Sequence, residues 1–132
     1  MKVTPDTNVL VRALTRDDPR QSRIAEATLL RAETVALTLP TLCELVWVLS
    51  RLYRRPPESV AMAIRTLIGS AGVVTDAPAA EAGLEALEAG GDFADAVIAH
   101  EGRRLGGAVF VSFDRKAVAL LKSRNQAASL LA

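Results

Sequence analysis

Two carboxylates, Asp92 and Asp95, lie three residues apart at the start of an apolar segment that has the period of a helix. Residues three apart share one face of a helix, so the two acids project together next to the core. The core stripe beside them is expected to comprise Phe93, Ala94, Val97 and Ile98. Taken alone, the pair favours helix capping, because Asp92 follows two glycines and an acid at the position of Asp95 suits the positive end of the helix dipole.

Two more acids occupy junctions between a predicted strand and a predicted helix. Asp6 follows a short strand over residues 2–5 and precedes a helix over residues 7–14. Asp114 follows the clearest strand of the chain, residues 108–112, and precedes a helix over residues 115–122. Each acid is a good N-cap. The same positions also lie at carboxyl ends of strands, where parallel α/β sheets bind ligands.

Glu44 is the single charged residue in a segment that is apolar nearly all round. The segment predicts a largely buried helix over residues 42–53. Glu44 could lie at the edge of the apolar stripe and reach towards Arg51. A metal ligand or a buried ion pair explains its position better, because an unpaired buried carboxylate is costly.

The elements that must position these acids alternate between short strands and helices, which predicts an α/β fold with a mainly parallel sheet in one domain over residues 1–132. The segment 108–112 is nearly all apolar, as a central strand buried on both faces should be. In the helix over residues 19–33 the apolar stripe is expected to be Ile24, Ala27 and Leu30. The other expected strands are residues 34–38, 73–75 and 127–131, and the other expected helices are 57–68, 79–89 and 92–105.

Carboxylates brought together would repel one another unless a cation neutralised them. Hard oxygen ligands suit Mg²⁺ or Mn²⁺. A zinc site is disfavoured because His100 and Cys43 are the only histidine and cysteine. His100 is expected to be an ordinary residue of a helix face.

The bulk composition excludes some classes of protein. Half of the 132 residues are apolar, which is enough for a core, and the formal net charge is +1, so the chain is not basic throughout. Any nucleic-acid-binding surface must therefore be local. A single cysteine fits a reducing cytoplasm. No secretory signal or membrane-spanning run is visible, so a cytoplasmic location without membrane attachment is expected.

Four motifs in order resemble those of PIN-domain ribonucleases, most closely the VapC-type toxins of toxin–antitoxin pairs. They are Asp6-Thr7-Asn8, Glu44 in its apolar helix, the segment from Asp92 to Ala99, and Ser112-Phe113-Asp114-Arg115. The resemblance covers essentially the whole chain and departs at Thr4-Pro5, where many relatives have aliphatic residues. It implies a PIN-like three-layer sandwich with a short, mainly parallel central sheet flanked by helices.

The same resemblance implies functional roles for individual residues. It makes Asp6, Glu44, Asp95 and Asp114 the catalytic acids that hold one or two Mg²⁺ or Mn²⁺ ions, with Asp92 auxiliary and Asn8 and Ser112 supporting. It implies an endoribonuclease that acts as the toxin of a type II pair, forms a homodimer and binds a cognate antitoxin. Because the acids repel RNA phosphates, basic residues must hold the substrate, and the candidates are Arg12, Arg115 and Lys116.

Other functions stay open from the residues. A haloacid-dehalogenase-like phosphatase would use Asp6 as a nucleophile, but it usually has a second Asp where this chain has Asn8. A receiver-like signalling domain would need adjacent acids after its first strand, and Asp76 would be its only mid-chain phosphate acceptor. A PIN fold that binds without cleaving is a third alternative.

Overall fold

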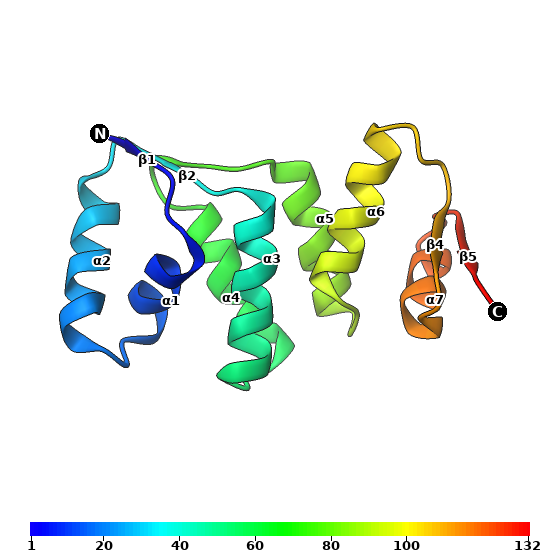
Figure 1. Cartoon of the computed structure of the whole chain (residues 1–132), viewed down its shortest axis with the longest axis horizontal. Coiled ribbons are helices and arrows are strands. Elements are labelled where there is room, and N and C mark those ends of the chain that lie inside the picture. Colours follow the sequence, from blue (N-terminus) through cyan, green and yellow to red (C-terminus); the bar gives the residue numbers. More distant parts are fainter. The chain divides into compact units, whose positions relative to one another are not determined.

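The computed structural model describes residues Met1–Ala132 and contains seven α-helices, one π-helix and five short strands. The chain forms two compact units, Met1–Asp76 and Ala77–Ala132, which Figure 1 draws from blue to green and from green to red. Every strand pairing is parallel. The predicted α/β class, with short parallel sheets, is therefore confirmed.

The first unit contains a three-stranded parallel sheet in the order β1-β2-β3. Lys2 pairs with Thr34, and Val35 pairs with Val73. Two α-helices connect each strand to the next, with the π-helix η1 between those of the second connection, as parallel pairing requires a long crossover. The strands are β1 (Lys2–Val3), β2 (Thr34–Ala36) and β3 (Val73–Val74), and the helices are α1 (Thr7–Thr15), α2 (Pro19–Arg31), α3 (Leu39–Trp47), the π-helix η1 (Val48–Leu52) and α4 (Pro57–Ile68).

The apolar stripe predicted for α2 is wrong. The buried residues of α2 are Ser22 and Ala25, while the side chains of Ile24 and Leu30 are 54% and 86% exposed. Ser22 donates a hydrogen bond from Oγ to the backbone carbonyl of Arg12 at 2.7 Å. Small residues therefore face α1 and allow the two helices to approach closely, and the larger apolar side chains point away.

Glu44 is exposed, so the buried ion pair considered for it is wrong. Leu42, Leu45 and Val46 of α3 are buried, but Glu44 and Trp47 are exposed. Glu44 and Trp47 are three residues apart, so they lie on one face of the helix, opposite the core. The predicted α-helix to residue 53 ends at Trp47 and continues as the π-helix η1.

The second unit begins with two packed helices, α5 (Ala77–Glu88) and α6 (Phe93–Arg104). Gly83 of α5 lies against the ring of Phe93, because a Cβ built on Gly83 would come within 2.6 Å of a ring carbon. Phe93, Ala96, Val97 and Ala99 are buried. Ile98, expected in the core stripe, is exposed.

A two-stranded parallel sheet completes the second unit. β4 (Phe110–Ser112) and β5 (Ala128–Leu130) flank α7 (Arg115–Ser123), and Phe110 pairs with Ala128. Within this unit β4 has a partner on one side, and Val111 is 56% exposed. Burial on both faces, as predicted for this strand, is therefore not found within the unit. No helix of the structure is long and apolar enough to cross a membrane.

Candidate metal centre

Asp6 stands at the junction of β1 and α1, as the sequence predicts. The strand ends at Val3, two residues before Pro5, which has no amide hydrogen for a ladder. Asp6 then adopts an extended conformation and caps α1, because its Oδ1 accepts a hydrogen bond from the Val9 amide at 3.1 Å. The side chain stays exposed, so the second carboxylate oxygen remains free to bind a cation.

Glu44 is joined to the residue that follows Asp6. Thr7 donates a hydrogen bond from Oγ1 to Oε2 of Glu44 at 3.2 Å, which links the start of α1 to α3. A hydrogen bond of this kind orients a carboxylate that would hold a metal. Thr7 was not predicted to be a site residue. Its only signal in the sequence is a hydroxyl directly after a proposed ligand.

Asn8, predicted to support Asp6, forms no hydrogen bond with it. Its side chain is exposed and lines a cavity of about 420 Å³ together with Asp6. Arg12, Gln21 and Ile24 are among the other residues of this cavity, which lies between α1 and α2. Within the first unit, the cavity places Asp6 at the edge of a space large enough for a small ligand.

The second unit brings three acids together. Asp92 caps α6, because its Oδ2 accepts a hydrogen bond from the Asp95 amide at 3.2 Å. Asp95 lies in the first turn of α6 and is half-buried. Asp114, at the start of α7, is close enough to act on Asp95 through its charge.

The pKa of Asp95 is raised to about 6, chiefly by partial burial and then by the negative charges of Asp92 and Asp114. Burial disfavours the charged carboxylate, and like charges nearby disfavour it further. An aspartate that only capped a helix would have a lowered pKa, because the positive end of the helix dipole favours the charged carboxylate. The three acids therefore form a site with excess negative charge, which a bound cation would relieve.

Asp114 follows β4 and caps α7. Its Oδ1 accepts hydrogen bonds from the amides of Lys116 at 2.9 Å and Ala117 at 3.2 Å. The Asp114 amide donates to Oγ of Ser112 at 2.9 Å. Ser112 thus fixes the backbone that carries Asp114, and the acid itself is exposed.

Replacing Asp114 by Asn is expected to leave the fold intact, because Asn caps a helix about as well as Asp. A matched control is Asp18→Asn, since Asp18 caps α2 by accepting the Gln21 amide at 3.1 Å. Thermal unfolding should give nearly equal midpoints for both variants and the wild type. Divalent-cation binding measured by calorimetry should be weakened in Asp114→Asn alone. Unfolding of Asp114→Asn would mean that its charge serves the fold instead.

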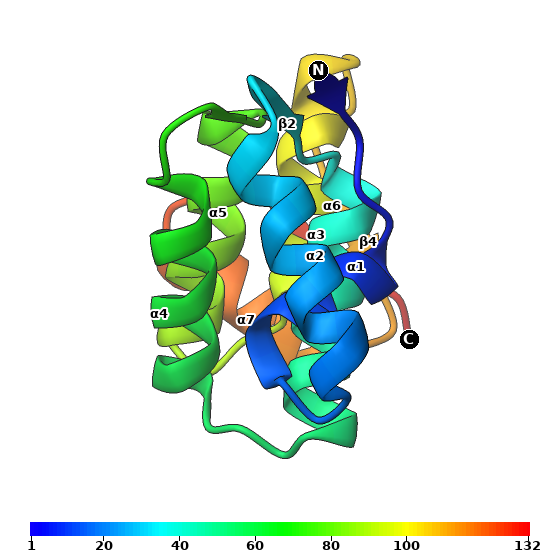
Figure 2. The same cartoon turned by 90° about the vertical axis from the view of Figure 1, so that its left-hand side faces the viewer.

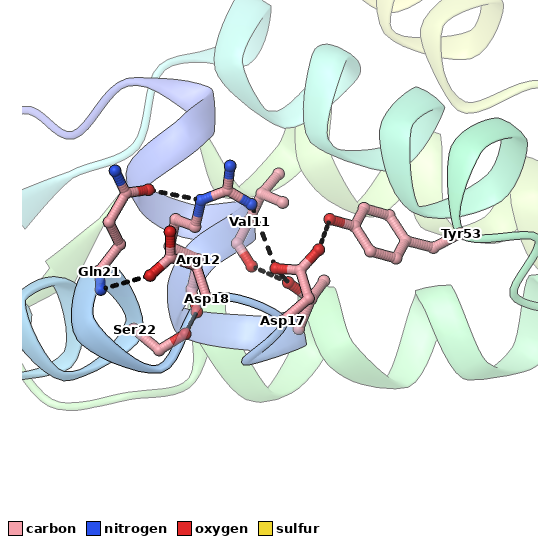
Figure 3. Close-up of polar contacts among 8 residues, drawn as sticks. Val11, Arg12, Asp17, Asp18, Gln21, Ser22 and Tyr53 are labelled. Atoms are coloured by element: carbon pink, nitrogen blue, oxygen red, sulfur yellow. Dashed lines mark hydrogen bonds and ion pairs between the residues drawn. The ribbon is translucent and has the colours of Figure 1, made fainter.

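Of the basic residues predicted to contact RNA, Arg12 is held in a polar network (Figure 3). Its Nε donates to Oε1 of Gln21 at 2.7 Å, and its Nη1 contacts Oδ1 of Asp17 at 3.1 Å. Tyr53 donates from its hydroxyl to Oδ2 of Asp17 at 2.6 Å (Figure 3). Arg115 and Lys116 are exposed and directly follow Asp114.

The hydrogen bond from Tyr53 is the largest cause that lowers the pKa of Asp17, followed by one from Thr15. A lowered pKa stabilises the fold above the ordinary pKa of aspartate, and this contribution is lost as the pH falls through the folded-state pKa. We expect Tyr53→Phe to raise the pKa of Asp17 towards its ordinary value, as carboxyl NMR titration would report. The variant should be slightly less stable than the wild type at pH 7, and the difference should shrink at acid pH. An unchanged Asp17 titration would contradict this assignment.

The donor set fits a hard divalent cation. Each unit offers exposed or half-buried carboxylate oxygens: Asp6 at the start of α1 with Glu44 of α3 in the first, and Asp92, Asp95 and Asp114 at the starts of α6 and α7 in the second. Oxygen donors without histidine or cysteine are typical of Mg²⁺ and Mn²⁺ sites. That all four predicted ligands meet at one centre stays a prediction.

Comparison with known proteins gives one family. The family model described as PIN domain matches residues 3–121, which includes both acidic groups. No curated protein matches the chain in sequence.

Proposed function

The chain belongs to the PIN domain family, whose members are generally metal-dependent nucleases, and we propose that it is an endoribonuclease that hydrolyses RNA phosphodiester bonds with Mg²⁺ or Mn²⁺. The observation that supports the proposal is the grouping of Asp92 and Asp114 with half-buried Asp95, whose pKa is raised to about 6, because a cluster of carboxylates of this kind suits a cation. The family match supplies the reaction class that such a cluster serves.

In this proposal Asp6, Glu44, Asp95 and Asp114 are the metal ligands, and Asp92 is auxiliary. A divalent cation lowers the pKa of bound water and neutralises charge on the phosphate. The chain itself fixes the ligands. Asp6, Asp92 and Asp114 are each held by backbone amides at a helix start, and Glu44 is oriented by Thr7. Ligands held in this way lose little freedom when a cation binds.

Basic side chains must offset the repulsion between the acids and RNA. Arg115 and Lys116 follow Asp114 and are exposed, so they can contact a phosphate next to the bond that is cut. Arg12 has two of its N–H groups engaged by Gln21 and Asp17. Its remaining donors can still reach a ligand in the cavity that it shares with Asp6.

The biological role that we propose is that of the toxin in a type II toxin–antitoxin pair. This role rests on the resemblance of the four motifs to VapC-type toxins, and it brings a homodimer and a cognate antitoxin as partners. Induced expression should arrest growth, and Glu44→Gln should remove the arrest at equal protein level. Growth arrest by the variant as strong as by the wild type would separate toxicity from the carboxylates.

The experiment that tests the activity is cleavage of total cellular RNA by purified protein free of copurifying partners. Parallel reactions contain Mn²⁺, Mg²⁺ or EDTA. Glu44→Gln is the variant, and Glu58→Gln, which changes an exposed acid at the start of α4, is the matched control. We expect discrete products with metal for the wild type and the control, and none for Glu44→Gln or in EDTA.

Three results would overturn the proposal. Cleavage that persists in EDTA would exclude a metal-dependent mechanism. Turnover of a phosphate monoester without any RNA cleavage would favour the phosphatase alternative. Cation binding without cleavage of any RNA would indicate a PIN fold used for binding alone.

A further inference from the structure

The outer face of α2 carries a row of three arginines, Arg20, Arg23 and Arg31, here called the arginine row. All three side chains are exposed, and none forms an ion pair or a side-chain hydrogen bond. Arg20, Arg23, Ala27 and Arg31 follow one another at intervals of three or four residues. The three arginines therefore share one face of the helix with Ala27. Figure 2 views the molecule from the side on which α2 lies. Three unpaired guanidinium groups on one face form a local positive surface, although the net charge of the chain is only +1.

The arginine row borders a hollow that continues towards Asp6. A cavity of about 430 Å³ is lined by the three arginines with Ile24, Ala27 and Thr28. The cavity that contains Asp6 shares Arg20, Ile24 and Thr28 with it. The two cavities therefore meet along Arg20, Ile24 and Thr28, and together they are here called the α2 groove. Asp6 lines its inner part, and Arg23 and Arg31 line its outer part. No acidic side chain lines its outer part.

The packing of the first unit leaves this face open for a ligand. Ser22 and Ala25 take the inner face of α2, and Ile24, which is 54% exposed, lies where the two cavities meet. The nearby acid Glu26 is already paired with Arg16 at 2.7 Å, and Asp18 is engaged as the cap of α2. The positive charge of the row is thus not neutralised within its own unit.

We propose that the α2 groove binds the phosphodiester backbone of single-stranded RNA and leads it to Asp6. This inference rests on the proposed nuclease function, and it names the path of the substrate. Arginine holds phosphate through paired donors more strongly than lysine does. Arg20 and Arg31 are separated by about 16 Å along the helix axis, which is long enough for several nucleotides. Exposed Ile24 and half-buried Ala27 offer apolar contacts for sugars and bases between the phosphates.

An acidic peptide would also be attracted to three arginines. RNA is the occupant that the geometry favours, because the groove opens at a proposed metal ligand that the scissile phosphate must reach. A peptide bound only for its charge has no reason to extend to Asp6. The peptide is therefore an outcome of the test that would overturn the proposal.

The test measures RNA binding without cleavage. Fluorescence anisotropy of a labelled single-stranded RNA follows binding to the full chain that carries Asp95→Asn, over a range of salt concentrations. The triple variant Arg20→Gln, Arg23→Gln and Arg31→Gln is compared with a matched triple variant of three other arginines. The control changes are Arg51→Gln, Arg54→Gln and Arg55→Gln.

We expect the α2 variant to bind at least about 10-fold more weakly at low salt and the control variant to bind nearly as well as its parent. Three lost phosphate contacts should make the dependence of log K on log salt shallower by about 2, at ~0.7 for each contact on a single strand. Equal affinity and equal slope for the two triple variants would overturn the proposal. Unchanged RNA binding with lost binding of an acidic peptide would overturn it in favour of a protein-docking face.

A second pair of variants keeps the arginines in place. Ile24→Glu introduces a carboxylate in the lining of the groove, and Leu30→Glu introduces one on the same helix but outside the groove. Both side chains are exposed, so both variants should fold. Only Ile24→Glu should weaken RNA binding, and equal effects of the two would contradict the assigned path.

Binding that depends on the arginine row in a chain that cleaves no RNA would reject the nuclease function but keep the groove.

Discussion

Asp95→Asn should lower metal-dependent RNA cleavage by at least about 100-fold. Removing a group that only orients a ligand already costs up to that factor, and Asp95 is proposed to be a ligand itself. Asn is nearly isosteric with Asp and keeps an oxygen donor, but it lacks the negative charge that holds a divalent cation. Initial rates with saturating Mg²⁺ or Mn²⁺ would measure the loss.

The same variant should be more stable than the wild type when no metal is present. The pKa of Asp95 is about 6 in the folded chain and 3.8 for an ordinary aspartate, so the folded state binds the proton more tightly. Stability therefore falls as the pH rises from about 4 through 6, and the loss is complete above that range. An asparagine at this position has no proton to lose, so the stability of Asp95→Asn does not fall over this pH range. Because Asp95 is partly exposed, solvent screening should reduce the difference at pH 8 to about 1 kcal/mol.

Urea unfolding in EDTA at pH 8 and pH 4 would test the sign. The stability advantage of Asp95→Asn should be present at pH 8 and nearly absent at pH 4. Saturating Mg²⁺ should stabilise the wild type more than the variant, since a ligand bound by the native state stabilises it. A variant that is less stable than the wild type at pH 8 in EDTA would show that the carboxylate of Asp95 serves the fold.

Asp92→Asn provides the matched control. Asn keeps the cap of α6 and removes one of the two charges that raise the pKa of Asp95. Carboxyl NMR should then show a lower pKa for Asp95, and cleavage should fall less than in Asp95→Asn. An unchanged Asp95 titration would show that the charge of Asp92 does not contribute, and would leave burial and Asp114 as the causes of the raised pKa.

The order and type of the elements are predictable from the sequence because their boundaries are local. Asp6, Asp18, Asp92 and Asp114 each cap a helix within three residues of themselves. Capping needs only the side chain and the amides that follow it, so the signal lies within one short segment. The four caps also explain why capping alone cannot distinguish a site acid from a structural one.

Burial was harder to predict because it depends on the partner that each element meets. Ile24 and Leu30 have the helical spacing of a core stripe, yet Ser22 and Ala25 face α1. Close helix packing selects small residues, which carry no hydrophobic signal. A buried ion pair was considered for Glu44 because its apolar neighbours predicted burial nearly all round the helix, but one face of α3 stays exposed.

The acids of the candidate site could be chosen from the sequence, but their partners could not. Thr7 meets Glu44 across 37 positions of the chain, and Tyr53 meets Asp17 across 36. No local pattern encodes such pairs, because they form only when separate helices pack. The arginine row lay in a helix predicted correctly, yet its exposed face appears only once the buried face of α2 is known.

Phe93→Ala should cause the largest loss of stability in the second unit, about 3–5 kcal/mol. The ring is 1% exposed and fills the space above Gly83, between α5 and α6. A loss of this size removes much of the stability of an ordinary domain. Because Phe93 lies between Asp92 and Asp95 in the sequence, cation binding by this unit should be lost with the fold. Phe113→Ala is the control, since Phe113 is 76% exposed and its removal should change stability by less than about 0.5 kcal/mol.

The contact between Phe93 and Gly83 can also be tested by changing Gly83. Gly83→Ala places a methyl group within 2.6 Å of the ring and should destabilise the chain by about 1–3 kcal/mol through overpacking. Phe93→Leu removes part of the ring's volume, so the double variant Gly83→Ala with Phe93→Leu should be more stable than the sum of the two single losses predicts. Chemical unfolding of the four chains gives this coupling directly. Additive losses would mean that the ring and Gly83 do not pack against each other. Other contacts between α5 and α6 would then have to position Asp95.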